Sequence, residues 1–214
     1  MNRQDYLRGW SDLHGGVAPR GLVGGWLRIS YALARPLAGL GVAPNVITLA
    51  GLVLAVLALP PAAGGSRWPL LAVLAIALSG VLDSLDGAVA VLTGRVSRRG
   101  AVLDPACDRL AELCFAGALW LAGADAGWCV AAGAVSLLHE QVRASARVNG
   151  MQDVGVVTVS ERPTRVIVAA AFLLGAGVYP GAAPTWTTAG AVVWTLLGVA
   201  GFVQVSIVVT RRLL

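Results

Sequence analysis

Four aspartates at helical spacing are the residues of this chain best suited to chemistry. Asp83 and Asp86 are three residues apart, and Asp104 and Asp108 are four residues apart. On helices, each pair would share one face. Four carboxylates that meet in a poorly hydrated site need a counter-charge, and a divalent cation is the simplest one. An all-oxygen ligand set favours Mg²⁺ or Mn²⁺, and two such ions would neutralise phosphate oxygens.

The surroundings of the aspartates leave three interpretations open. Gly87 leaves bare backbone beside the carboxylates, where a nucleotide could approach closely. Carboxylates inside a membrane are also expected along the ion or proton pathway of a transporter. In the third interpretation the carboxylates only meet solvent at the ends of membrane spans.

The composition indicates which elements must position these side chains. Hydrophobic residues make up 57% of the 214 residues and charged residues only 13%, whereas soluble domains carry about 25% charged residues. This composition predicts a polytopic α-helical membrane protein. The net charge of +5 is then explained by the arginine bias of cytoplasmic loops, and no nucleic-acid partner is expected.

Hydropathy predicts an all-α integral membrane fold of six transmembrane helices. Residues 1–43 form an N-terminal cytoplasmic and interfacial segment, in which Leu22 to Leu40 is expected to be an amphipathic helix lying in the interface. Residues 44–214 form the transmembrane domain. Its spans are predicted at about 46–63, 68–92, 101–124, 126–147, 166–182 and 185–210.

The placement of arginine predicts the orientation. Arginines gather before the first span, between spans two and three, around the connection of spans four and five, and at the end of the chain, whereas the opposite side holds only Arg67. Both termini are therefore expected in the cytoplasm of a multi-pass protein of the cell membrane. The aspartates then lie near the cytoplasmic face.

The aspartates also belong to a longer pattern. The order Asp-x2-Asp-Gly-x2-Ala, followed by Gly-x3-Asp-x3-Asp, resembles the signature of the CDP-alcohol phosphotransferase family. The chain matches this signature, with every spacing kept, at Asp83, Asp86, Gly87, Ala90, Gly100, Asp104 and Asp108. Members of that family have six transmembrane helices after an interfacial helix and are usually homodimers, so the resemblance covers nearly the whole chain.

The resemblance implies a role for each aspartate. Asp83, Asp86 and Asp104 would ligate one metal ion, Asp83, Asp104 and Asp108 would ligate or adjoin a second, and Asp108 would be the general base. It also implies contacts with the CDP donor, for which the positions in this chain are Asn45, Val46, Ile47, Thr48, Gly87, Val91 and Ser97.

Three positions depart from the family. Val91 replaces an arginine that lies near the donor diphosphate, and loss of this cation should weaken donor binding unless another cation substitutes. The second half resembles phosphatidylinositol-phosphate synthases, which implies acceptor contacts from Arg143, Arg162 and Arg165. Two expected cations are absent, however, with Gln141 and Val205 in their places.

The expected activity is transfer of a phosphatidyl group from CDP-diacylglycerol to a hydroxyl of a polar acceptor, inositol phosphate or a related polyol, with release of CMP. Asp108 would remove the proton from that hydroxyl. The expected cofactor is Mg²⁺ or Mn²⁺ as two ions, and the expected partners are membrane lipids and a second copy of the chain. The alternatives are a catalytically altered or inactive relative that binds CDP-lipid, and an ion-coupled transporter that uses the carboxylates.

Overall fold

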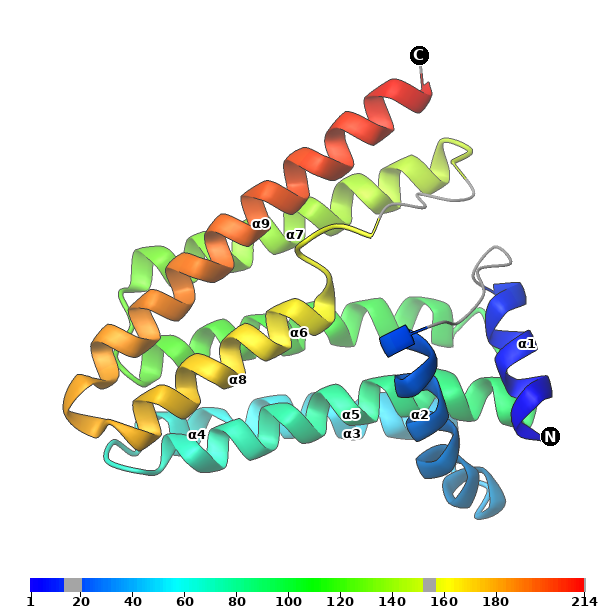
Figure 1. The fold of residues 1–214 in the computed structure, drawn as a ribbon, viewed down its shortest axis with the longest axis horizontal. Coiled ribbons are helices and arrows are strands. Elements are labelled where there is room, and N and C mark those ends of the chain that lie inside the picture. Colours follow the sequence, from blue (N-terminus) through cyan, green and yellow to red (C-terminus); the bar gives the residue numbers. More distant parts are fainter. Residues whose placement is uncertain (14–20, 152–156, 214) are drawn as a thin grey trace. The chain divides into compact units, whose positions relative to one another are not determined.

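The computed structural model describes residues 1–13, 21–151 and 157–213. Within these ranges every regular element is a helix (Figure 1). In chain order they are α1 (Arg3–Leu13), α2 (Gly21–Gly39), α3 (Pro44–Leu57), α4 (Leu59–Ala63), α5 (Pro69–Thr93), α6 (Gly100–Leu121), α7 (Ala126–Val148), α8 (Arg162–Val178), the 3-10 helix η1 (Pro180–Ala182) and α9 (Ala183–Leu213). Residues 14–20 of the predicted N-terminal segment lie outside the described residues.

All six segments predicted to span the membrane are helical. The first is divided into α3 and α4 at Ala58, which precedes Pro60 and Pro61. Proline has no backbone N–H to donate, so it interrupts a helix or begins a new one. The other five predicted segments correspond to α5, α6, α7, α8 and α9, with ends that differ by at most a few residues.

Three described segments are long and apolar enough to cross a membrane, and they make the chain a membrane protein. They are Pro44–Ala63, Pro69–Thr93 and Pro180–Arg212. Helices α6 and α7 are long enough, but each has charged residues near one end, and α8 has only 17 residues. All six predicted segments are therefore confirmed as helical, whereas six membrane crossings remain a prediction.

The chain forms two compact units. The first contains Met1–Val53 and Leu78–Asp108, and the second contains Leu54–Ala77 and Arg109–Leu214. The first unit joins the N-terminal helices to the ends of α5 and α6 that carry the aspartates. The functional division between residues 43 and 44 stays a prediction.

The first unit is built around a small apolar core. Leu27 and Ala34 of α2 and Leu85 and Val89 of α5 are buried in it, together with Tyr6 of α1. Helix α2 was predicted, whereas α1 was not. Asn2 was a local signal for α1, because asparagine is often the residue before a helix, and its side chain accepts a hydrogen bond of 2.9 Å from the Asp5 amide.

The second unit contains α7, α8 and α9, and α9 packs along both α7 and α8 (Figure 1). Small residues allow this close approach. A Cβ atom added at Gly190 of α9 would lie 2.6 Å from Cβ of Phe172 on α8. Close packing at small residues is what holds helices together in lipid, where apolar side chains gain little by leaving the solvent.

The connection between α5 and α6 determines where the aspartates can meet. Helix α5 ends at Thr93. The next residue, Gly94, has a φ of 65°, which suits glycine. The amides of Gly94 and Arg95 donate to the carbonyls of Val91 and Ala90 and so close the helix. Helix α6 begins three residues after Ser97, whose Oγ accepts a 3.0 Å hydrogen bond from the Gly100 amide. A connection this short keeps the two helix ends adjacent.

Candidate metal centre

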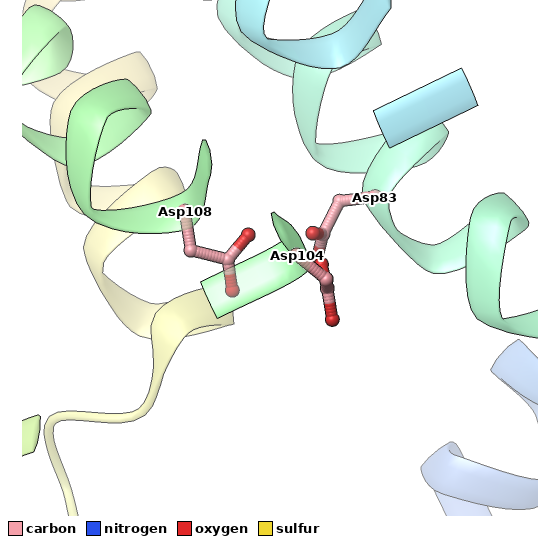
Figure 2. A group of neighbouring side chains, drawn as sticks. All are labelled: Asp83, Asp104 and Asp108. Atoms are coloured by element: carbon pink, nitrogen blue, oxygen red, sulfur yellow. The ribbon is translucent and has the colours of Figure 1, made fainter. Parts of the chain in front are cut away.

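Three of the four predicted metal ligands lie together. Asp83 of α5 and Asp104 and Asp108 of α6 each offer a carboxylate oxygen, and these oxygens lie within 4.8 Å of one another. All three side chains are half-buried, and Figure 2 shows their carboxyl groups close to one another between the two helices. The helical spacing of Asp104 and Asp108 places both on the side of α6 that faces Asp83.

The arrangement fits a divalent cation. Three carboxylates at this separation repel one another when ionised, and a metal ion relieves the repulsion better than protonation does near neutral pH. Carboxylate oxygens are the preferred ligands of Mg²⁺ and suit Mn²⁺. A centre of this kind can bind and polarise the oxygens of a phosphate or diphosphate.

Asp86, the fourth predicted ligand, has a different environment. It is 5% exposed, and its carboxylate accepts hydrogen bonds of 2.5 Å from Thr48 Oγ1 and from the Gly87 amide. Because Asp86 is three residues beyond Asp83, its side chain is rotated about 60° around the helix axis, toward α3. Its role as a metal ligand stays a prediction, and the structure adds that it joins α5 to α3.

The residues predicted to contact the donor gather in the first unit. Asn45, Val46, Ile47 and Thr48 form the first turn of α3; Ile47 and Thr48 are buried, and Val46 is exposed. Gly87 is exposed although its neighbours on α5 are buried, and a Cβ atom added there would touch nothing within 4 Å. Its bare backbone is therefore open, as the sequence analysis expected.

Gly100 of the motif brings two of these residues together. A Cβ atom added at Gly100 would lie 3.2 Å from both Asn45 Oδ1 and Ser97 Oγ. These two side chains therefore lie beside each other, next to the first turn of α6. Glycine is needed at this position because a larger side chain would displace the polar atoms of one or both neighbours.

Val91, predicted to face the donor, packs in the apolar core of the first unit. A Cβ atom added at Gly9 of α1 would lie 3.3 Å from Val91 Cγ1. Val91 therefore packs against α1 and helps to position it, a contact that was not predicted from the sequence. Arg95, the nearest arginine after Val91 in the sequence, donates a 3.4 Å hydrogen bond to the Gly41 carbonyl.

The three arginines expected to contact the acceptor lie in the second unit and differ in their environments. Arg165 is 1% exposed, and its Nη1 donates to both carboxylate oxygens of Glu112, at 2.8 and 3.0 Å. Arg143 donates through both terminal nitrogens to Glu161, at 2.9 and 2.5 Å. Arg162 is the first residue of α8 and is half-buried.

Glu112 pairs with arginines from its own helix and from a neighbouring one. Arg109 Nη2 lies 3.4 Å from Glu112 Oε1, and Arg165 is the partner from α8. The same two arginines also contact Glu140 of α7, at 3.2 and 3.1 Å. Because unpaired charges are costly in an apolar interior, two arginines and two glutamates form a neutral cluster.

Sequence reasoning missed the polar residues that extend this cluster. The ring of His139 is fully buried, and both of its nitrogens have polar neighbours. Thr158 and Ser160 are also buried, at 5% and 1% exposure. The signal that could have found them is the occurrence of polar residues beside an apolar span, since buried polar groups require partners.

Comparison with known proteins agrees with the motif. The model of the CDP-alcohol phosphatidyltransferase family matches residues 41–209, most of the chain. The chain belongs to this family.

Its relatives are consistent with one branch of the family. The chain is 35% identical over 162 residues to the phosphatidylinositol phosphate synthase of Mycolicibacterium smegmatis, a match covering 72% of this chain and 69% of the relative. Crystal structures of the Mycobacterium tuberculosis phosphatidylinositol phosphate synthase are similar in fold. The structure with CDP-DAG bound has a TM-score of 0.67 and 28% identity, covering 85% of this chain and 94% of that one. The structure in complex with manganese and citrate has a TM-score of 0.67 and 27% identity, covering 84% and 88%.

Proposed function

We propose that this chain transfers a phosphatidyl group from CDP-diacylglycerol to a hydroxyl of inositol phosphate or a related polyol, and releases CMP. The observation that carries the proposal is the meeting of Asp83, Asp104 and Asp108 in a family whose chemistry acts on a CDP-linked diphosphate. The relatives named above supply the donor and the acceptor class.

The aspartates have distinct tasks in this proposal. Asp83, Asp104 and Asp108 hold Mg²⁺ or Mn²⁺, with Asp86 as a further ligand or as the residue that orients Thr48. Bound divalent ions would neutralise charge on the diphosphate oxygens and on the departing CMP. Asp108 accepts the proton of the acceptor hydroxyl, whose oxygen attacks the β-phosphorus of the donor. The bond from phosphorus to the CMP oxygen breaks, and no covalent enzyme intermediate forms.

The residues that gather around the motif glycines are proposed to hold the donor. Asn45 and Ser97 lie next to Gly100, which precedes Asp104 by four residues, and the bare backbone of Gly87 follows Asp83 by four residues. Val91 supplies no charge, so donor binding depends on the metal ions and on the backbone. Arg143 and Arg162 are proposed to contact the acceptor, whereas the full engagement of Arg165 by carboxylates favours a role in holding helices together.

The proposed setting is a multi-pass protein of the cell membrane with its active site on the cytoplasmic side. Exposed apolar residues on one face of α2, among them Val23, Trp26, Ile29 and Leu33, support an interfacial position for this helix. Six crossings and a homodimer complete the proposal.

The direct test is release of CMP by the purified protein in detergent, with Mg²⁺, CDP-diacylglycerol and a panel of acceptors. Asp108→Asn should reduce the rate by a factor of about 10² to 10⁴, as loss of a general base does. Asp125→Asn is the matched control, because Asp125 caps α7 by accepting from the Trp128 amide and asparagine caps equally well. Metal-dependent ion flux in liposomes without CMP release would favour a transporter, and CDP-lipid binding without turnover on any acceptor would favour an inactive relative.

A further inference from the structure

A continuous chain of hydrogen bonds connects the buried charge cluster to the segment before α8. His139 Nε2 lies 3.1 Å from Thr158 Oγ1, and Thr158 Oγ1 lies 2.8 Å from Glu161 Oε1. At the other side of the ring, His139 Nδ1 lies 2.9 Å from Arg165 Nη2. The chain of contacts thus runs from α8 through α7 into residues 157–161.

The direction of each hydrogen bond follows from chemistry. A guanidinium only donates, so His139 Nδ1 accepts from Arg165 and carries no hydrogen. The hydrogen of the neutral ring is therefore on Nε2, which donates to Thr158 Oγ1. A carboxylate only accepts, so the single hydroxyl hydrogen of Thr158 goes to Glu161. This assignment satisfies all three contacts with a neutral ring. Nδ1 also lies 3.2 Å from Glu140 Oε1, and because a carboxylate only accepts, that approach is not a hydrogen bond in this tautomer.

Glu161 is the point at which this hydrogen-bond network meets the half-buried Arg143. Its Oε1 also accepts 2.7 Å from the Thr158 amide, and the carboxylate is held by both terminal nitrogens of Arg143. Glu161 directly precedes Arg162, which begins α8. The position of the Glu161 carboxylate therefore determines both where Arg143 is held and the direction in which the backbone enters α8.

Two contacts that do not belong to this series of hydrogen bonds hold residues 157–161 in place. The Val159 amide donates 3.0 Å to Gln204 Oε1 of α9, and a Cβ atom added at Gly201 would lie 2.6 Å from Ser160 Cβ. Residues 157–161 are therefore packed against α9 and hydrogen-bonded to α7. A segment held on two sides is preorganised before any ligand arrives.

We propose that Thr158 is a positioning residue for acceptor binding. Its hydroxyl is hydrogen-bonded to both His139 and Glu161, so it holds the Glu161 carboxylate in place and thereby fixes Arg143 and Arg162. This proposal rests on the proposed function, because the acceptor is the ligand that these arginines would meet. Thr158 itself touches neither substrate. A positioning defect should weaken acceptor binding more than it slows the chemical step.

The test compares Thr158→Val with Thr158→Ser. Valine has nearly the shape of threonine but neither accepts from His139 nor donates to Glu161, whereas serine retains the hydroxyl. Thr158→Val should raise the KM for the acceptor about tenfold and leave kcat and the KM for CDP-diacylglycerol within about twofold, whereas Thr158→Ser should stay within about twofold of wild type in all three. An unchanged acceptor KM in Thr158→Val, or an equal loss in Thr158→Ser, would overturn the proposal.

A second measurement does not depend on turnover. In wild type, the amides of Thr158 and Val159 both donate to side chains and should be protected from hydrogen exchange in detergent. Thr158→Val should exchange faster over residues 157–161 while α7 and α9 keep their protection. If wild type releases no CMP but the exchange result holds, the proposed function fails and the positioning network stands. If this segment exchanges freely in wild type, the network itself is wrong.

Discussion

At the scale of single residues, the carboxylates fall into two sets. Asp83, Asp104 and Asp108 approach one another, where a metal ion could bind, whereas Asp86 is hydrogen-bonded to Thr48. Glu112 and Glu140 are neutralised by arginines, which make a charge in an apolar interior tolerable. Substitutions in the aspartate cluster should therefore act on metal binding, and substitutions of Glu112 or Glu140 on the stability of the fold.

Gly100 provides a prediction at this scale. Gly100→Val should weaken binding of the CDP donor at least tenfold, because its side chain would push against Asn45 Oδ1 and Ser97 Oγ. Gly25→Ala in α2 is the control, since a Cβ atom there meets nothing within 4 Å and alanine favours a helix. Isothermal titration with a soluble CDP-alcohol measures both. Equal affinities in the two variants would contradict a donor site at Asn45 and Ser97.

Glu161 predicts a dependence of stability on pH. Burial alone would raise its pKa, but the hydrogen bonds from Arg143 and Thr158 and the charge of Arg143 lower it below its ordinary value of 4.5. A carboxylate with a lowered pKa stabilises the folded state fully above its unfolded pKa, and this contribution is lost as the pH falls through the folded pKa. The stability gap between wild type and Glu161→Gln should therefore be constant above about pH 5.5 and shrink below about pH 4.5. Thermal unfolding in detergent from pH 3.5 to 7 measures the gap, and a gap that widens on acidification would refute the assignment.

At the scale of elements, the second unit is held by polar contacts as well as by close packing. Arg165 of α8 contacts Glu112 of α6 and Glu140 of α7, so one side chain connects three helices. Such contacts fix the rotation of each helix about its axis, which apolar packing alone specifies poorly in lipid. In the first unit, the Thr48–Asp86 hydrogen bond joins α3 to α5 in the same way.

The three-helix connection predicts a large effect of Arg165→Gln. Removing this cation leaves the buried Glu112 and the half-buried Glu140 with Arg109 of α6 as their arginine partner among the described residues, and the cost should be about 3–5 kcal/mol. Arg147→Gln, at the exposed end of α7, should cost less than about 0.5 kcal/mol. Denaturation in mixed detergent measures both. A loss in Arg165→Gln no larger than in Arg147→Gln would show that the cluster does not support the fold.

At the scale of the whole molecule, six predicted segments follow the N-terminal segment and are helical, but length and apolarity qualify only three described segments as spans. The 17-residue length of α8 and the charges at the ends of α6 and α7 explain the difference, because these charges lower the apparent hydropathy of helices whose remaining length is apolar. Charged residues near the end of a span can reach the interface or pair within the protein. The proposed six crossings are consistent with this arrangement.

Labelling from one side of the membrane tests the topology. Arg98→Cys, in the α5–α6 connection, should react with an impermeant maleimide only from the cytoplasmic side, whereas Ser66→Cys, between α4 and α5, should react only from the opposite side. Both positions are exposed, and of the native cysteines Cys107 and Cys129 are buried and Cys114 is half-buried. Reaction of both variants from the same side would rule out six crossings in this order.

The sequence alone determined the helical membrane class, the position of every predicted helix and the approach of three of the four aspartates, because hydropathy and helical spacing act over short distances along the chain. Only the tertiary structure decided that Asp86 bonds to Thr48, that Val91 seats α1, and that Arg165 is buried among carboxylates instead of being open to a ligand. These outcomes depend on which residues of distant segments meet, and no local pattern specifies the partner of a buried polar group.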